Sequence, residues 1–121
     1  MQIEVKGRNL PVTDELREHV SRRFDKIAKQ VSELAVLEIE VSKERNPANP
    51  ENQVAEATLQ LKGVTLRARE GSSDLMHSVD LVADKLARQV KRHRDKRRKR
   101  REQRAAAAAP PEAAGGQLPA M

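Results

Sequence analysis

Residues 85–104, KLARQVKRHRDKRRKRREQR, are the part of this chain best suited to chemistry with a charged partner. Twelve Lys or Arg lie there against Asp95 and Glu102, a net charge of +10 in a chain whose 121 residues together carry +6. The remaining residues are therefore mildly acidic as a group. A cationic segment on an acidic protein indicates a polyanionic partner. Arginine suits phosphate in particular, because its planar guanidinium donates two parallel hydrogen bonds.

Solubility and membrane binding account for this cationic stretch less well than a nucleic acid does. A solvated tail would only raise solubility, and acidic residues usually do that better. A helix on a membrane surface would need an apolar face, which residues 91–104 lack. The phosphates of a nucleic acid would instead turn repulsion between neighbouring cations into attraction and release condensed counterions. We therefore expect nucleic-acid binding that weakens steeply as salt rises, and a free helix end that frays beyond Val90.

The scarcity of aromatic residues limits how a nucleic acid could be recognised. Phe24 is the only aromatic residue in the chain and lies on a stripe predicted to be buried. Stacking of bases on exposed aromatics, as in modules that bind single-stranded RNA, is therefore excluded. Recognition must depend on phosphates, sugar hydroxyls and shape, which favours folded RNA. Charge does not exclude DNA, but basic-region readers of the major groove usually dimerise through heptads, and none follow here.

The sequence contains no pattern of catalytic or metal-binding residues. His19, His77 and His93 share no metal-ligand spacing, and the absence of Cys excludes disulfides and thiolate chemistry. We expect no enzymatic activity, no cofactor and no small-molecule substrate. The N-terminus lacks the layout of a signal peptide, and no apolar run approaches the ~20 residues of a membrane span. A cytosolic protein without a membrane partner is the expectation.

The hydrophobic pattern predicts the elements that must position the cationic stretch. Residues 2–6 alternate like a half-buried strand, and Thr13 can cap a helix that follows. Gly63 can supply the positive φ of a tight turn after Lys62, and residues 72–74 can cap a second helix. Three later strands are predicted over residues 37–41, 55–61 and 64–68. The buried stripes of the two helices are Leu16, Val20, Phe24, Ile27 and Val31, and Leu75, Val79, Val82, Leu86 and Val90.

The predicted order is β-α-β-β-β-α in a single α+β domain. Four strands with one apolar face require a cover, and the two amphipathic helices supply it by packing on one face of the four-stranded sheet. The apolar stripe of the second helix ends at Val90, so the basic residues beyond it have no core to pack against. From residue 105 the composition changes to Ala, Pro and Gly, and we expect residues 105–121 to form a disordered tail.

Two stretches resemble a known family. MQIEVKGRNLPVTDELREHVSRRFDKI, residues 1–27, resembles the opening of the ribosome hibernation-promoting factors, the family that includes ribosome-associated inhibitor A. SSDLMHSVDLVADKLARQVKRHRDK, residues 72–96, resembles their second helix. The resemblance spans residues 1 to about 98 and implies a fold like that of double-stranded-RNA-binding domains. Members of the family have often been labelled modulators of an alternative sigma factor.

The resemblance implies a function and a set of contacts. Family members bind the small ribosomal subunit in its mRNA channel near the decoding centre, cover mRNA and tRNA positions, and silence ribosomes during starvation or cold. Carried over by position, the ribosomal RNA contacts on the second helix are Lys85, Arg88, Gln89, Lys91, Arg92, His93, Arg94 and Lys96. Further candidates are Arg22 and Lys26 on the first helix and Arg67 and Arg69 on the outer sheet face. Helical spacing also points Arg88, Lys91 and Arg92 away from the core stripe.

The resemblance also divides the chain into segments. We expect a ribosome-binding α/β domain at residues 1–92, a basic extension of the second helix at residues 93–104, and the tail. Met76 replaces a common Tyr of the family, and residues 98–104 extend the basic run beyond the usual end of short members. Long members add a C-terminal domain that pairs two ribosomes. We therefore expect a short form or a truncated long form that does not pair ribosomes itself, with a helper factor for pairing as a candidate partner.

The expected function is translation silencing by a cytoplasmic, ribosome-associated protein. Its expected partner is the small ribosomal subunit with its 16S-type ribosomal RNA. Two alternatives stay open: a transcription modulator that acts through a sigma factor, and a nonspecific nucleic-acid-binding protein.

Overall fold

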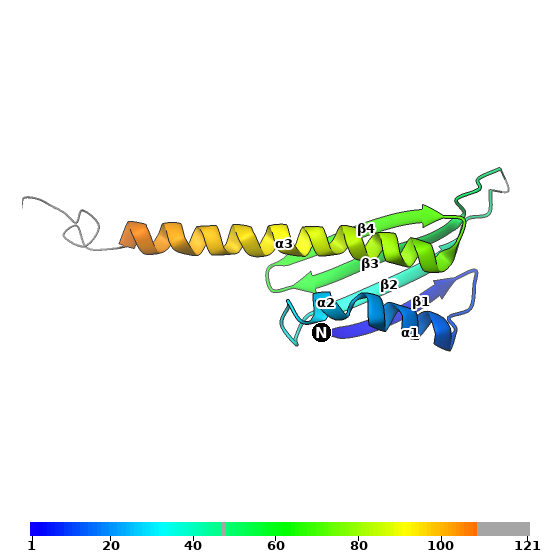
Figure 1. Cartoon of the computed structure of the whole chain (residues 1–121), viewed down its shortest axis with the longest axis horizontal. Coiled ribbons are helices and arrows are strands. Elements are labelled where there is room, and N and C mark those ends of the chain that lie inside the picture. Colours follow the sequence, from blue (N-terminus) through cyan, green and yellow to red (C-terminus); the bar gives the residue numbers. More distant parts are fainter. Residues whose placement is uncertain (47, 109–121) are drawn as a thin grey trace, which may run out of the picture. The chain divides into compact units, whose positions relative to one another are not determined.

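The computed structural model of the protein describes residues 1–46 and 48–108. The chain forms two compact units, Met1–Val90 and a second that begins at Lys91. The elements (Figure 1) are β1 (Gln2–Arg8), α1 (Asp14–Arg23), α2 (Asp25–Ala28), β2 (Val36–Lys43), β3 (Gln53–Leu61), β4 (Val64–Ser72) and α3 (Leu75–Ala108). This order confirms the predicted β-α-β-β-β-α succession, with the first predicted helix divided into α1 and α2.

The strands form one four-stranded sheet in the order β1-β2-β3-β4. β1 pairs with β2 in parallel, and the crossover through α1 and α2 makes that direction possible. The other two pairings are antiparallel. The register sets Ile39 of β2 between Val5 of β1 and Ala57 of β3, with Ala68 of β4 next to Ala57. Because side chains alternate along a strand, this register gathers the apolar ones on one face and the charged ones on the other.

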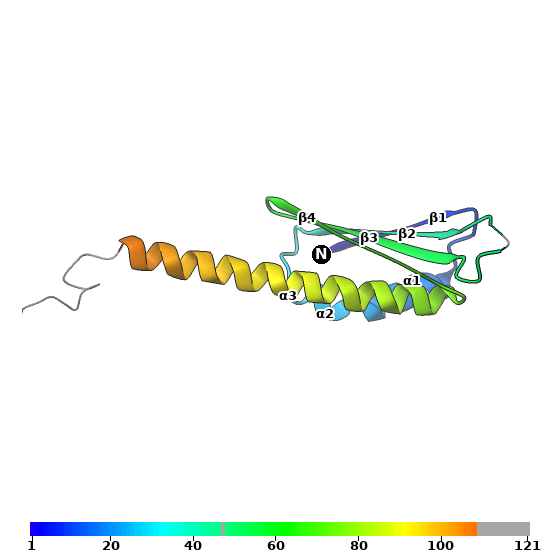
Figure 2. The ribbon, with the colours of Figure 1, turned by 90° about the horizontal axis from the view of Figure 1, so that it is seen from above.

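The helices form a second layer on the apolar face of the sheet. α1 and residues 75–90 of α3 lie side by side there, and among the described residues the opposite face has no cover (Figure 2). The core between the layers includes Phe24, Leu37 and Leu86, whose exposed fractions are all 0%. Burying one side chain of this size stabilises a fold by roughly 1.5–3 kcal/mol. The arrangement confirms the predicted α+β class with helices on one face of the sheet.

The first predicted helix is divided at Phe24. α1 begins after Thr13, whose Oγ1 accepts a hydrogen bond from Leu16 N (3.1 Å), as predicted for an N-cap. At Phe24 the backbone leaves helical geometry (φ −96°, ψ 4°), and α2 follows as a single turn. Phe24 and Ile27 both remain in the core, so the apolar stripe continues across the bend, and the half-buried Val31 lies beyond α2. The prediction of one continuous helix is therefore corrected to two.

Two glycines are required by the paths of the loops. Gly63 has φ 80° in the predicted turn between Leu61 and Val64, which pair across it. Gly7 lies near the end of β1, where a Cβ atom would clash with the backbone oxygen of Leu10. The chain turns between those two residues at Asn9, which adopts φ 63°.

In the second unit, residues 91–108 are helical. The side chains of residues 91–106 are exposed except for that of His93, which is half-buried. Helix α3 thus includes residues 105–108, the start of the predicted disordered tail, and residues 109–121 lie outside the described residues. Over the described ranges, no helix combines the length and the apolar composition that a membrane span requires.

Candidate nucleic-acid interface

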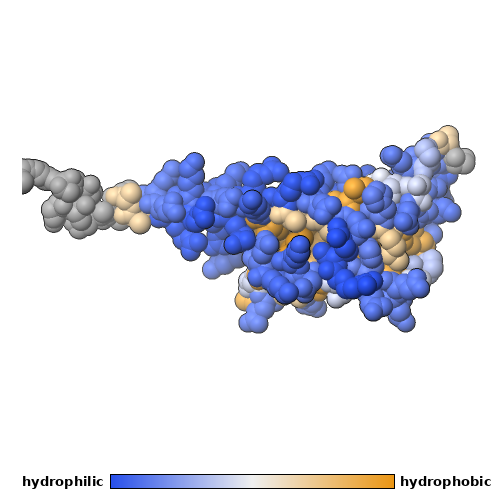
Figure 3. Space-filling model, viewed as in Figure 1, coloured by the Kyte–Doolittle hydropathy of each residue, from blue (hydrophilic) through white to orange (hydrophobic). Residues whose placement is uncertain are grey.

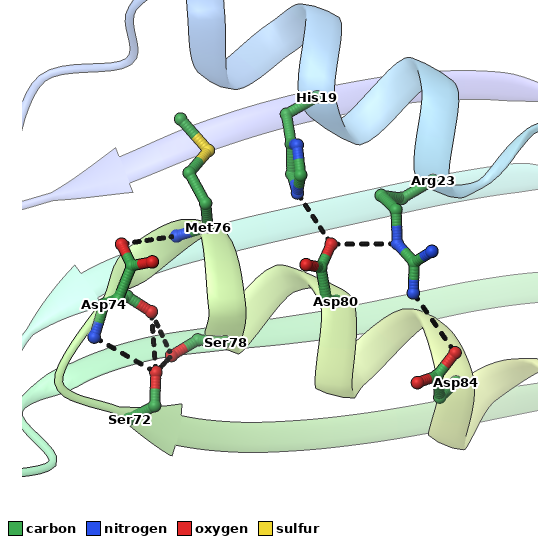
Figure 4. Close-up of polar contacts among 8 residues, drawn as sticks. All are labelled: His19, Arg23, Ser72, Asp74, Met76, Ser78, Asp80 and Asp84. Atoms are coloured by element: carbon green, nitrogen blue, oxygen red, sulfur yellow. Dashed lines mark hydrogen bonds and ion pairs between the residues drawn. The ribbon is translucent and has the colours of Figure 1, made fainter.

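Two buried hydroxyls fix the start of α3, the helix that carries most of the predicted contacts (Figure 4). Ser78 Oγ donates to Gln53 O on β3 (2.6 Å). Ser72 Oγ lies 2.7 Å from Ser78 Oγ, as Figure 4 shows. Asp74 N donates to Ser72 Oγ (3.2 Å), and Asp74 Oδ1 accepts from Met76 N (3.4 Å) in the manner of an N-cap. Because a buried hydroxyl without a partner is destabilising, this chain of hydrogen bonds sets where α3 begins relative to β3.

Polar side-chain contacts between α1 and α3 hold the two helices side by side. Asp80 Oδ1 lies 2.7 Å from His19 Nε2 and 2.8 Å from Arg23 Nε, and Arg23 Nη2 lies 3.2 Å from Asp84 Oδ1 (Figure 4). Partly exposed pairs of this kind each contribute about 1 kcal/mol or less. None of these four residues is among those predicted to be functional. The signal in the sequence was the i, i+4 spacing of Asp80 and Asp84, which puts two carboxylates on one side of the helix.

Two of the predicted RNA contacts on α3 have partners on the sheet. Lys85 Nζ lies 3.0 Å from Glu70 Oε2, and Gln89 Nε2 donates to Arg67 O (2.8 Å). Both partners belong to β4, the outer strand beside α3. These side chains therefore hold α3 against the sheet in the free protein.

The open face of the sheet carries the predicted contacts Arg67 and Arg69 among opposite charges. Arg69 pairs with Glu44 (2.8 Å) and lies across from Glu56 in the β3–β4 register. The same face holds the ion pairs Lys6–Glu38 (3.3 Å) and Arg8–Glu40 (2.6 Å). This face is therefore nearly balanced in charge and offers a phosphate backbone little net attraction.

Three predicted contacts of the first unit are exposed. Arg22 lies on α1, Lys26 on α2 and Arg88 on α3. Within the described residues, no ion pair or hydrogen bond engages any of these three side chains. They differ in this respect from Lys85 and Arg69, and an arriving phosphate would not have to displace a carboxylate.

Residues 91–104 of α3 form the most strongly charged surface of the protein, here called the basic segment. Ten Lys or Arg stand in it against two acidic residues, a net charge of +8. On the face drawn in Figure 3, the surface of this segment is uniformly hydrophilic, whereas apolar patches appear over the first unit. Arg94, Arg97, Arg98 and Arg101 surround one shallow hollow, together with Asp95. A phosphate in that hollow would meet several guanidinium groups at once.

His93 is the exception within the basic segment. Its Nε2 is buried and has no hydrogen-bond partner among the described residues. Burial lowers the pKa of His93 below its usual 6.5, and the positive charges of Arg97, Arg100 and Lys96 lower it further. At neutral pH the imidazole is therefore uncharged, and it adds no positive charge to the predicted set of contacts.

The described residues contain no group of three or more His, Cys, Asp or Glu side chains that could hold a metal ion. What the arrangement can do chemically is bind anions through guanidinium and ammonium groups.

Comparison with known proteins places the chain in a family. The family model described as Sigma 54 modulation protein / S30EA ribosomal protein matches residues 3–98. The chain is 32% identical over 97 residues to the ribosome hibernation promotion factor of Picosynechococcus sp. (strain ATCC 27264 / PCC 7002 / PR-6). It is 33% identical over 98 residues to that of Staphylococcus aureus (strain COL). Each alignment covers 79% of this chain and 50% of the relative, so the chain spans about half the length of these two proteins.

A third relative is closer in length. The ribosome hibernation promoting factor of Acinetobacter guillouiae is 29% identical over 99 residues, which cover 78% of this chain and 88% of that protein.

Solved structures share the fold. The N-terminal domain of Protein Y from Thermus thermophilus matches with a TM-score of 0.65 and 28% identity, covering 77% of this chain and 99% of that chain. A ribosomal subunit interface protein from Coxiella burnetii also matches with a TM-score of 0.65, and its 22% identity makes it a likeness of fold alone. The family match extends from β1 into the basic segment and covers most of the chain. The chain therefore belongs to the Sigma 54 modulation protein / S30EA ribosomal protein family.

Proposed function

We propose that this protein is a ribosome hibernation factor. Three relatives carry that name, and the family description names a ribosomal protein. In the proposed action, the protein binds the small ribosomal subunit in its mRNA channel, near the decoding centre, and blocks mRNA and tRNA positions. Silencing by occupancy needs neither a catalytic group nor a cofactor. The protein would act on ribosomes in the cytoplasm.

The observation that carries the proposal is the concentration of exposed cations on one helix. Arg88, Lys91 and Arg92 are all exposed, and the basic segment that follows Val90 has a net charge of +8. Such an array binds phosphates with release of counterions. Phe24, the only aromatic residue, is fully buried, so the protein cannot recognise bases by stacking them on an exposed ring. These properties favour a folded RNA read by shape and phosphate position.

We place Arg88, Lys91 and Arg92 at the centre of the contact, with Arg94 and Lys96 beside them. In this assignment, residues 1–92 are the ribosome-binding domain and residues 93–104 its basic extension. His93 contributes no charge at neutral pH because its pKa is lowered.

The other assigned residues would contribute less. Lys85 and Gln89 can reach RNA only by leaving their partners on β4. Arg67 and Arg69 lie on a face whose charges nearly cancel. Arg22 and Lys26 need no such exchange and form a second group of contacts.

A sedimentation experiment tests the proposed function. Purified protein is mixed with ribosomes, and the ribosomes are pelleted at low and at raised salt. We expect the protein to pellet with small subunits at low salt, to be released as salt rises, and to be displaced by bound mRNA and tRNA. No co-sedimentation at low salt, or co-sedimentation indifferent to mRNA and tRNA, would contradict the proposal. A pull-down that recovers a sigma factor or polymerase, but no ribosomal proteins, would favour transcription modulation instead.

A matched pair of variants tests the site. Replacing Arg88, Lys91 and Arg92 by Glu should abolish silencing of translation in vitro, because three cations become anions where phosphates are expected. The control replaces Arg17, Lys43 and Lys62, which are exposed cations outside the assigned contacts, by Glu. Both variants change the net charge equally and leave the core intact. Equal silencing by the two variants would refute the assignment of the site.

A further inference from the structure

We infer that residues 97–104 form a second RNA-binding element, which fits into a groove of folded RNA that has phosphates on both walls. The choice of RNA rests on the proposed function, whereas the groove follows from the geometry of the helix. None of the contacts carried over from the family falls in this stretch, because they end at Lys96.

The cations of this stretch point in all directions around the helix axis. Successive residues of an α-helix are rotated by about 100°. Arg97 and Arg100 therefore lie on one side, and Arg98 and Lys99 lie about 180° away, on the other side. Arg104 falls on the side of Arg97 and Arg100. All these side chains are exposed.

A flat phosphate surface would use only one side of such a helix. Helix α1 is one-sided in this sense, because the side that carries Leu16 and Val20 is buried in the core and only the other side is open to a partner. Residues 97–104 have no apolar side chain at all, so no side of the stretch can pack against an apolar protein surface or insert into lipid. The single acidic residue, Glu102, lies seven residues after Asp95 and hence on nearly the same line along the helix. This line falls on the side of Arg98 and Lys99, which nevertheless presents two cations, so positive charges face outward on opposite sides of the helix and fit a ligand that surrounds it.

The dimensions of a nucleic-acid groove agree with this arrangement. A helix with its side chains is about 10–12 Å across, and the major groove of B-DNA, which admits a helix, is about 12 Å wide with a phosphate backbone along each edge. The regular major groove of an RNA helix is narrower, so the inferred groove is one that is widened where RNA helices meet or are interrupted. Cations on opposite sides of α3 would then reach opposite walls.

The second RNA-binding element, residues 97–104, spans the point where the match to the family model ends. The family match ends at residue 98, whereas α3 continues to Ala108. Lys99, Arg100, Arg101 and Arg104 therefore lie beyond the matched region. The alanines that follow Arg104 have the highest helix propensity, which favours continuation of the helix in spite of charge repulsion. The stretch thus extends the contact surface expected from the family.

Two matched double variants test whether the helix is surrounded. Arg97→Gln with Arg100→Gln removes two charges from one side, and Arg98→Gln with Lys99→Gln removes two charges from the opposite side. The probe is protein-free RNA extracted from small ribosomal subunits, and the affinity is measured as a function of salt. We expect each double variant to bind at least ~10-fold more weakly than the wild type at ~0.1 M salt, with a salt slope shallower by about 1.5. If only one of the two variants, or neither, bound the RNA more weakly than the wild type, the inference of a groove would be wrong.

A second pair of variants tests whether the helix itself is needed. Glu102→Ala and Glu102→Pro raise the net charge equally, but proline breaks the helix. We expect Glu102→Ala to bind the RNA at least as tightly as the wild type, and Glu102→Pro to bind at least ~5-fold more weakly than Glu102→Ala. Equal binding by the two variants would mean that a flexible polycation suffices, and the inference would be wrong. Duplex DNA of the same length, bound as tightly as the RNA, would contradict the choice of RNA.

The failure of this inference can be told apart from that of the proposed function. If both double variants bind RNA like the wild type while the Arg88, Lys91 and Arg92 variant no longer silences ribosomes, only the second element is refuted. If the double variants weaken RNA binding but the wild type neither pellets with ribosomes nor silences them, the second element stands and the proposed function fails.

Discussion

The first unit and the basic segment use their charges in opposite ways. Residues 1–90 contain 14 Lys or Arg and 15 Asp or Glu, a net charge of −1, whereas residues 91–104 carry +8. In the first unit, Lys6, Arg8, Arg23, Lys29, Arg69 and Lys85 pair with carboxylates. The basic segment has only Asp95 and Glu102 to offset ten cations. Many charged side chains of the first unit therefore pair within the protein, whereas the basic segment has an excess of positive charge with which to bind an anionic partner.

The same contrast appears in burial. The first unit contains every fully buried apolar side chain of the described residues, up to Val90. Beyond Val90, all described side chains except that of His93 are exposed. Stability and binding should therefore respond to different substitutions, and three predictions test how complete that separation is.

The largest expected effect is the loss of a core side chain. Phe24→Ala should lower the free energy of unfolding by about 3–5 kcal/mol, because Phe24 is fully buried between the helices and the sheet. Urea unfolding followed by circular dichroism measures the change. Arg100→Ala is the control and should change the free energy of unfolding by no more than about 0.5 kcal/mol. Similar destabilisation by the two substitutions would mean that the basic segment takes part in the fold, which would contradict the separation of stability from binding between the two regions.

A smaller effect is expected at the start of α3. Ser78→Ala should lower the free energy of unfolding by about 1–3 kcal/mol, because it leaves Gln53 O and Ser72 Oγ without a partner they now have. Ser73→Ala removes an exposed hydroxyl two residues before the helix and serves as the matched control. If the two variants unfold at the same urea concentration, the hydroxyl chain does not anchor the helix.

The smallest expected effect is the pH response of His93. Its pKa is lowered in the folded helix, so the unfolded segment binds a proton more readily than the folded one. The helix is therefore most stable above pH 6.5, the usual pKa, and loses stability as the pH falls from there toward the lowered pKa of the folded state. Circular dichroism between pH 7.5 and pH 5, roughly the range in which an ordinary histidine titrates, should show a small loss of helix in the wild type.

His93→Gln supplies the control for that titration, because glutamine cannot be protonated in this range. The variant should keep its helix content as the pH falls. A loss of helix as large as that of the wild type would assign the response to other groups.

Much of the fold could be predicted because its signals are local. Alternation of apolar residues indicated the strands, the turn at Gly63 followed from its neighbours, and Thr13 marked the start of α1. The bend at Phe24 could not be predicted, because the apolar stripe keeps helical spacing through a break that only the backbone reveals.

The candidate site was less predictable, because its details depend on residues distant in sequence. Lys85 and Gln89 lie 15 and 22 residues from their partners on β4, so their roles in holding α3 could not be read from helical spacing. The lowered pKa of His93 depends first on burial, which the sequence does not display. The positive charge of the basic segment, by contrast, is a property of composition alone. The assignment of particular residues to RNA contacts stays a prediction.

The two outer strands of the sheet have a consequence for how the protein behaves when concentrated. Each outer strand has one row of backbone groups that no neighbouring strand pairs, and such rows invite a second copy to add its own strand. Lys6 and Arg8 lie along β1, and Arg67 and Arg69 along β4, and charged side chains on an outer strand disfavour the addition of a further strand. Gln89 also occupies one carbonyl of β4. Both outer edges thus carry features that disfavour edge-to-edge pairing between copies of the chain.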